Sequence, residues 1–457
     1  MHSNQRRLGA AAAIIVAATP FTSLAQKSAD TQLDSLVATA VGVNPAIRSA
    51  EQRTFAARAR ISAAGARPDP TLMLGVLNLP ARHPSFTADD MTMKMIGVEQ
   101  VLPYRGKLGL RTLVAKRDAE VAAAASDSVR LATIREVKST YYDLAFADQA
   151  IAIAERSHAV LNDIVTVARG RYSAGRGTQA EVLRANLEAT RLNESVNALR
   201  EERAGALATL NALLDRPSET PFQSPAIGER IAGAAVSRSL NNIRFISQAL
   251  GASAADSPLP PLAELQEIAV RSSPVLRASA AMIDAKTAEV ELARKESLPD
   301  IALSLQYGQR SGSTTTSHGS SMPRADMISA VVSIPIPLQK GRKQDAIVSA
   351  TNSELQALQS ERAALTNSVR AQVARLYADI EHNRTQLALY VKAILPQGRA
   401  TLTSATGNYQ SGNGDLIPVL SAQETIFDYE TGYYRSLTDF AKKIAELEAL
   451  VGKEVLP

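Results

Sequence analysis

A pattern of seven fixed residues occurs twice in this chain, beginning at Gly170 and again at Gly407. It reads G-x-Y-x-x-G-x-G-x(4)-V-L-x-A in both copies. Seven identities at one fixed interval indicate a tandem duplication, so the fold must be interpreted as two similar halves. Each copy lies between two long segments rich in alanine and leucine, and is therefore predicted to form the turn between two long helices.

The residues around each turn predict how the return helices begin. The glycines can adopt the left-handed conformation that ends a helix. Thr178 and Glu181 form a T-x-x-E capping box, which predicts the start of the first return helix. In the second copy Asp415 is the expected N-cap. Pro418 is tolerated in the first turn that follows, because the N–H groups of that turn have no helical partner.

Composition and motifs exclude several classes of function. The chain has no cysteine, which excludes disulfides, thiolate metal sites, cysteine nucleophiles and a lipid anchor on an N-terminal cysteine. The formal net charge of +5 is too small to predict nucleic acid as a partner. No phosphate-binding glycine loop, H-E-x-x-H motif or nucleophile elbow is present. We therefore expect neither an enzyme nor a cofactor.

Residues 1–25 are predicted to be a secretory signal peptide. Arg6 and Arg7 precede an apolar core from Leu8 to Ala18, and residues 23–25 form a small-x-small cleavage site. The alternative, a membrane-anchoring helix, is weaker because the apolar run is too short to span a bilayer. We expect the mature protein to be exported, and any part of it that spans a membrane to do so with strands.

Two pairs of strands are predicted, one pair in each half. After Pro68-Asp69 and again after Pro299-Asp300, apolar residues alternate with small or polar ones, which is the period of a strand. Each strand is long enough to cross an outer membrane when tilted; the alternative is a soluble hairpin packed on a helix. The two pairs enclose polar loops, and the predicted strands are 71–79, 91–102, 300–310 and 326–337.

Four strands cannot close a membrane barrel, because known barrels begin at eight strands. An unclosed sheet in lipid would leave backbone groups unpaired along its edges, at several kcal/mol each. If these strands span a membrane, the protein must therefore be an oligomer whose subunits share one barrel. A dimer would supply about eight strands and a trimer about twelve, and the sequence does not choose between them.

The helical parts predict a rod. Long helices are expected over residues 107–169 and 342–406, each about 95 Å in length, with shorter return helices over 178–214 and 415–451. Pro396 should kink the second long helix, whereas its counterpart, Ala159, should not. After the signal peptide the chain is expected to comprise a first repeat (26–214), an equatorial connector (215–261) and a second repeat (262–457).

With these features in place, the chain resembles the TolC family of outer-membrane efflux channels over essentially its whole mature length. The resemblance implies a mainly α fold with a small β part, in which three copies share a twelve-stranded transmembrane barrel. It also implies a helical tunnel across the periplasm, a periplasmic adaptor at the tunnel end and an inner-membrane pump. Three stretches look most like the heavy-metal branch of the family: residues 68–70, 91–98 and 395–397.

The resemblance also suggests site residues. It places adaptor docking at the two tips: Arg171, Tyr172, Ser173, Ala174, Gly175, Arg176, Gly177, Tyr409, Gln410, Ser411, Gly412, Asn413 and Gly414. Some relatives close the tunnel with a ring of aspartates on the second return helix, where this chain has uncharged residues. The gate candidates are therefore Pro418, Ser421, the neighbouring Asp415, and, on the first return helix, Glu181 and Arg184.

The implied function is passive conduction of substrate, heavy-metal cations being the expected class, from pump and adaptor to the exterior. A multidrug or type I secretion channel is the alternative within the family, and a soluble secreted coiled-coil scaffold is the alternative outside it. No metal site is expected. Met91, Met93 and Met95 share one face of the second predicted strand and would face the lumen. Thioethers bind soft Cu(I) or Ag(I), but methionine is also ordinary packing material.

Overall fold

The computed structural model describes residues 21–222, 227–235, 259–315 and 321–456. The predicted signal peptide therefore lies mainly outside the described residues, and residues 21–25 begin the first helix. Residues 223–226 and 236–258 of the predicted connector also lie outside the described part of the chain.

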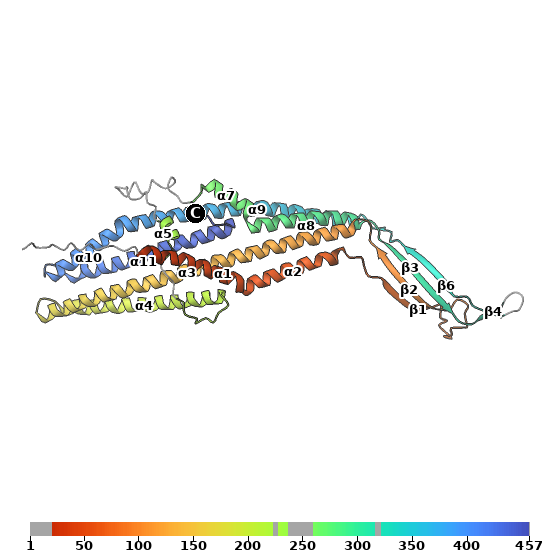
Figure 1. The fold of residues 1–457 in the computed structure, drawn as a ribbon, viewed down its shortest axis with the longest axis horizontal. Coiled ribbons are helices and arrows are strands. Elements are labelled where there is room, and N and C mark those ends of the chain that lie inside the picture. Colours follow the sequence, from red (N-terminus) through yellow and green to blue (C-terminus); the bar gives the residue numbers. More distant parts are fainter. Residues whose placement is uncertain (1–20, 223–226, 236–258, 316–320, 457) are drawn as a thin grey trace, which may run out of the picture.

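The molecule is a long rod of helices with a small β-sheet at one end (Figure 1). Helix α3 runs without a break from Lys107 to Ser173, and its 67 residues give a length of about 100 Å. Its counterpart in the second half consists of α9 (Gln344–Leu389), a π-helical segment (Tyr390–Ile394) and α10 (Leu395–Gln410). Helices α4 (Gln179–Leu213) and α11 (Leu416–Val451) return from the tips. The long antiparallel hairpins expected from the duplicated pattern are confirmed.

Shorter helices continue the return path toward the sheet. Helix α2 packs along α3, and α8 packs against both α3 and α9. A short equatorial helix, α5, lies against α1 and α11. The bounds of these elements are α1 Phe21–Val43, α2 Pro45–Gly65, α5 Glu229–Ala235, α7 Leu262–Ser272 and α8 Pro274–Glu296.

The chain restarts a helix at Asn44-Pro45 as the sequence predicts. The Asn44 side chain accepts from the N–H of Ala46 at 2.9 Å and donates to the carbonyl of Leu213 at 3.0 Å, so the cap also joins α2 to the end of α4. The second half restarts at Ser273-Pro274, where the serine makes no side-chain cap bond. The proline supplies the first helical residue in both halves, where its missing N–H has no helical partner.

Pro396 interrupts the second long helix as predicted. The π-helical segment Tyr390–Ile394 directly precedes α10, and the N–H of Leu395 bonds to the carbonyl of Tyr390, five residues back. The regular α-helical ladder is therefore altered just before the residue that has no N–H. The wider turn coincides with a close approach to α11. A Cβ on Gly432 would lie 2.6 Å from the hydroxyl of Tyr390, so only glycine gives this tyrosine room.

The four predicted strands form one antiparallel sheet in the order β1-β2-β3-β6. Several strand ends were predicted too long, and Met91 lies in the turn before β2, so it does not share a strand face with Met93. The polar outer loop of the second half contains a short two-stranded sheet, β4-β5, that the sequence did not predict. The bounds are β1 Thr71–Leu77, β2 Met93–Leu102, β3 Ile301–Arg310, β4 Ser313–Thr315, β5 Ser321–Pro323 and β6 Met327–Ser333.

The apolar face of the four-stranded sheet is its exposed face. On β3 the side chains of Leu303 and Leu305 are exposed, whereas the alternating Ser304 and Gly308 are buried. This is the reverse of a soluble hairpin, whose apolar face packs on the core. Cross-strand pairing continues the apolar face over the sheet through Leu72, Leu74, Ile96, Val98, Tyr307, Ile328 and Val332.

Two hydrophobic clusters hold the helices together. The larger lies around the middle of the rod, where Tyr141, Phe440 and Leu265 are almost completely buried. The smaller joins the two hairpins near their tips and includes Leu161, Leu192 and Tyr409. Over the ranges that the structure describes, no helix combines the length and the hydropathy needed to cross a bilayer.

Candidate tip and gate residues

The two tips have the same backbone structure. In the first, Ala174 donates to Gly170 and Arg176 donates to Arg171, at 3.1 and 2.8 Å. In the second, the equivalent bonds run from Ser411 to Gly407 and from Asn413 to Asn408, both at 3.0 Å. The duplicated pattern therefore specifies one turn geometry, built twice.

Two glycines in each turn are required by that geometry. Gly175 and Gly412 have φ values of +67° and +86°, the left-handed region that side chains other than glycine rarely adopt. A Cβ on Gly177 would lie 3.3 Å from the backbone nitrogen of Tyr172, and one on Gly414 would lie 3.3 Å from the backbone carbon of Asn408. These contacts explain why the glycines recur at a fixed spacing.

The start of the first return helix agrees with the predicted cap, and the start of the second does not fully agree. Thr178 accepts from the backbone N–H of Glu181 at 3.2 Å. Asp415 occupies the N-cap position before α11, but its side chain makes no cap hydrogen bond. The expected capping role of the Asp415 carboxylate is therefore wrong, although α11 begins where the sequence predicts.

The side chains of the two tips differ. Arg171 donates from Nη1 to the carbonyl of Tyr409 at 2.6 Å, and its guanidinium carbon lies 4.5 Å from the centre of the Tyr409 ring. The Tyr409 hydroxyl donates to Glu181 Oε2 at 3.2 Å. Two residues of the first hairpin thus hold one tyrosine of the second. We call Arg171, Glu181 and Tyr409 the tip clasp.

Burial and charge keep the tip clasp in its bonded state. The Tyr409 side chain is 1% exposed, whereas Tyr172, its counterpart, is 50% exposed. Burial, followed by the charge and the hydrogen bond of Glu181, raises the pKa of Tyr409 above that of an ordinary phenol. The hydroxyl is therefore protonated at neutral pH and available as a donor to the Glu181 carboxylate.

Most of the predicted docking residues are exposed and gather at one end of the rod. Both turns lie at the end opposite the sheet (Figure 1). Tyr409 is buried, because its ring is enclosed by the other hairpin, and Arg171, Gly177 and Gly414 are half-buried. The exposed members are Tyr172, Ser173, Ala174, Gly175, Arg176, Gln410, Ser411, Gly412 and Asn413.

The predicted gate candidates fall into two groups. Glu181 is half-buried and engaged with Tyr409. The others are exposed and lie at or within the first two turns of the return helices: Arg184, Asp415, Pro418 and Ser421. At the position equivalent to Glu181 the second half has Pro418, and at the position equivalent to Arg171 it has Asn408, so the second hairpin lacks both groups that hold a tyrosine.

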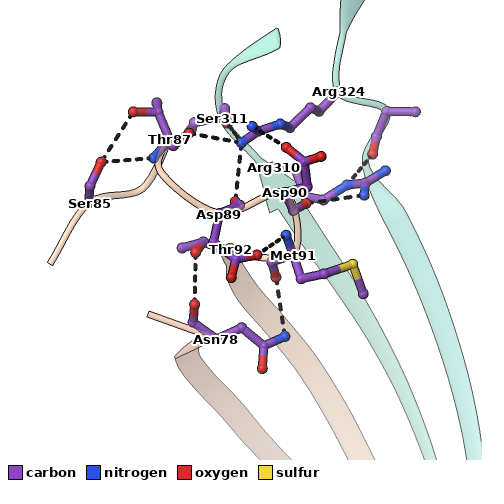
Figure 2. Close-up of polar contacts among 11 residues, drawn as sticks. Asn78, Ser85, Thr87, Asp89, Asp90, Met91, Thr92, Arg310, Ser311 and Arg324 are labelled. Atoms are coloured by element: carbon purple, nitrogen blue, oxygen red, sulfur yellow. Dashed lines mark hydrogen bonds and ion pairs between the residues drawn. The ribbon is translucent and has the colours of Figure 1, made fainter. Parts of the chain in front are cut away.

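A contact at the opposite end of the molecule was missed by the sequence analysis. Arg324 lies between the outer loops of the two halves and donates to the carbonyls of Thr87, Asp89 and Ser311 at 3.0–3.3 Å (Figure 2). It also forms an ion pair with Asp90. No local signal could have found this contact, because its partners come from two polar loops far apart in sequence.

The methionines on β2 pack within the sheet. The side chain of Met93 lies over Gly308 of β3, and that of Met95 lies over Gly75 of β1. Among the described residues, no group of three or more His, Asp or Glu side chains is placed to hold a metal ion.

Comparison with known proteins agrees with this architecture. The family model described as "Outer membrane efflux protein" matches residues 36–216 and 265–453, one segment in each half. Protein CyaE of Bordetella pertussis is 24% identical over 388 residues, which cover 83% of this chain and 75% of that protein. Cobalt-zinc-cadmium resistance protein CzcC of Cupriavidus metallidurans is 22% identical over 354 residues, which cover 76% of this chain and 74% of that protein.

Solved structures share the fold along nearly the whole chain. The outer-membrane channel OprN superposes with a TM-score of 0.73 at 19% identity, covering 96% of this chain and 94% of that one. The outer membrane protein VceC of Vibrio cholerae gives 0.73 at 17% identity, with coverages of 94% and 98%. Since the family model matches both halves, this chain belongs to the outer membrane efflux protein family, whose members are non-enzymatic channels of the outer membrane that extend into the periplasm.

Proposed function

We propose that this chain is the outer-membrane channel of a tripartite efflux system, in which three copies share one barrel and one helical tunnel. The observation that carries the proposal is the four-stranded sheet, whose exposed face is apolar and whose outer strands are β1 and β6. In hydrocarbon, the unpaired N–H and C=O groups of those two strands would cost several kcal/mol each. Pairing between copies removes that cost and encloses a lumen.

Extraction and sizing test the assembly. The mature protein should stay in the membrane fraction until detergent is added, and should then run as a trimer. A water-soluble monomer obtained without detergent would contradict the proposal. It would favour the soluble coiled-coil scaffold instead.

The exposed tips are proposed to dock a periplasmic adaptor. They form the end of the rod farthest from the sheet and present polar backbone and side chains on both turns. Replacing Arg176 with Glu should weaken efflux in cells, because it reverses a charge at the tip. Arg58 is the control, since it is an exposed arginine on α2, away from the tips, and Arg58→Glu should leave efflux unchanged. Equal loss in both variants would contradict docking at the tip.

The tip clasp is proposed to hold the tunnel end closed. It joins the two hairpins of one protomer through three contacts: a charge-assisted hydrogen bond from Arg171, a cation–π contact, and a hydrogen bond from the phenol of Tyr409 to the carboxylate of Glu181. Opening would then require Tyr409 to leave its site. Arg184, Asp415, Pro418 and Ser421 stay proposed gate positions toward the neighbouring copies.

Heavy-metal cations are the proposed substrate class. The support is the similarity to the cobalt-zinc-cadmium resistance protein CzcC, while the similarity to CyaE is at least as extensive. A multidrug or type I secretion channel is therefore the alternative. Deleting this protein alone and comparing tolerance to Cu, Ag, Zn, Cd, Co and organic drugs side by side distinguishes the two. Sensitivity to drugs alone would overturn the metal assignment.

The β2 methionines are not part of this proposal, because packing against glycines accounts for Met93 and Met95. Replacing Met91, Met93 and Met95 with Leu tests whether they bind metal. We expect unchanged copper tolerance. Lost tolerance with an intact trimer would show a metal role for the thioethers.

A further inference from the structure

The two β-hairpins of one protomer have the same register. Residues 71–77 pair with residues 93–99, and residues 302–308 pair with residues 327–333. The first strands of the two hairpins are related by the interval from Asp69 to Asp300, and the second strands by the interval from Pro103 to Pro337. Applying these two intervals converts every pair of the first hairpin into a pair of the second. The duplication therefore extends to the individual hydrogen-bonded partners.

Inside the protomer the two hairpins are joined by one seam, between β2 and β3. This seam runs from the pair Met93 and Arg310 to the pair Leu102 and Ile301. We call the end of this seam that lies next to the helices its inner end. There Lys107 is buried, and its ammonium group contacts the carboxylate of Asp300 at 2.8 Å. The equivalent of β2 is β6, and the equivalent of β3 is β1, and these are the two outer strands of the sheet.

We propose that β6 of one copy pairs with β1 of the next copy in the register of the internal seam, so that Val332 lies opposite Leu74. This inference rests on the proposed homotrimer and specifies how its copies join. Applying the same two intervals to the internal pair Val98 and Leu305 gives this intermolecular pair.

The face of each side chain agrees with that register. Leu74 and Val332 are both exposed on the apolar face, with exposed fractions of 70% and 63%. A slip of one residue would put every apolar side chain of one strand opposite the polar face of the other. The neighbouring pair places Val331 opposite Gly75, which leaves room for the larger side chain.

Charges at the inner end of the seam are also complementary. Asp69 is the equivalent of Asp300, and the position equivalent to Lys107 falls at Gly341, within a turn that carries Lys340, Arg342 and Lys343. All four charged side chains are exposed, and among the described residues none of them makes an ion pair within the protomer. Across the seam, Asp69 and this basic turn repeat the internal contact between Asp300 and Lys107.

Disulfide cross-linking tests the register. The chain has no native cysteine, so any disulfide that forms must join the introduced residues. The variant Leu74→Cys with Val332→Cys should give a covalent trimer on oxidation. The variants that combine Leu74→Cys with Ala330→Cys or with Ile334→Cys displace one partner by two residues. Their separation would be roughly 7–8 Å, too long for a disulfide. Within one protomer residues 74 and 332 lie on opposite edges of the sheet. The residue across the sheet from Leu74 is Ile328, and Val332 is displaced further along β6, so the two positions are roughly 20 Å apart.

The outcomes separate the register from the assembly. A covalent trimer from the in-register pair alone supports the proposal. Cross-linking from either displaced pair alone, or from none of the three in a protein that still runs as a trimer, overturns the register and leaves the proposed channel intact. A protein that runs as a monomer before oxidation overturns the proposed homotrimer itself.

A charge reversal tests the inner end of the seam without cysteines. Asp69→Lys should lower the temperature at which the detergent-solubilised trimer dissociates by roughly 2–4 °C, because it places a positive charge against the basic turn. Glu219→Lys, on an exposed equatorial turn, makes the same charge change away from the seam and should have no effect. Equal dissociation temperatures for the two variants would overturn the ionic contact. They would leave the basic turn as a candidate for anionic lipid headgroups.

Discussion

The two tips have the same backbone conformation, but the equivalent tyrosine is buried in one tip and exposed in the other. The turn hydrogen bonds of the first tip recur at the equivalent positions of the second, yet Tyr409 is buried between the hairpins and Tyr172 is exposed. The difference in burial comes from the residues that surround each tyrosine. Arg171 and Glu181 hold Tyr409, while the equivalent positions of the second hairpin are Asn408 and Pro418, which offer neither a cation nor a carboxylate. The duplication preserved the turn, and substitutions around it left the first hairpin alone with the two groups that hold the tyrosine of the other hairpin.

The largest expected effect is the loss of the Tyr409 ring. Tyr409→Ala should lower the free energy of unfolding of the tip region by about 3–5 kcal/mol, because it empties an enclosed site and removes the two contacts of the Tyr409 side chain, with the Arg171 guanidinium and with Glu181. Single-channel conductance in a planar bilayer should rise as the tunnel end opens. Tyr172→Ala is the matched control and should change stability by less than about 0.5 kcal/mol. Similar losses in both variants would erase the distinction between the tips.

The second effect concerns the cation. Arg171→Met keeps the apolar stem of the side chain but removes the guanidinium, which should cost about 1.5–3 kcal/mol, the range for a hydrogen bond to a charged group. Asn408→Met places the same side chain at the equivalent, exposed position, where no cation is lost, and should be close to neutral. Denaturant unfolding of the detergent-solubilised protein measures both variants. A neutral Arg171→Met would assign the burial of Tyr409 to packing alone.

The third effect isolates the hydroxyl. Tyr409→Phe keeps the ring but removes the donor to Glu181, so it should cost about 0.5–1.5 kcal/mol. Conductance should rise less than in Tyr409→Ala. Tyr172→Phe is the control, and it should behave as wild type because its side chain is half exposed to solvent. A greater loss in Tyr172→Phe than in Tyr409→Phe would reverse the comparison.

The smallest effect appears only at alkaline pH. Burial and Glu181 raise the folded-state pKa of Tyr409, so its stabilising contribution is complete below the unfolded-state value of about 10. The contribution is lost as pH rises through the raised folded-state pKa. Phenolate absorbance should therefore lose a late-titrating component in Tyr409→Phe. Loss of an early component instead would show that the hydroxyl is exposed.

Local sequence patterns were sufficient to predict where helices restart and which segments form strands. Asn44-Pro45 and Pro396 act through their own backbone chemistry, so the helix restart and the altered turn were predictable from single positions. Alternation on β3 predicted a strand with one apolar face. Asp415 lies at the predicted N-cap, but its expected capping hydrogen bond is absent, and the short β4-β5 sheet in the polar outer loop of the second half was not predicted. Both depend on whether a local hydrogen bond competes successfully with other conformations, and a propensity does not settle that.

The sequence by itself determined the duplication, the helical hairpins, the four strands of the main sheet and hence the need for several copies, because periodicity and repeat spacing are properties of the chain. The tertiary structure decided which tyrosine is buried, which lysine meets Asp300 and how Arg324 joins the outer loops. Those choices depend on partners far away in the sequence, as the bond from Arg171 to Tyr409 shows. Identical local motifs cannot distinguish such partners until packing brings the two halves side by side.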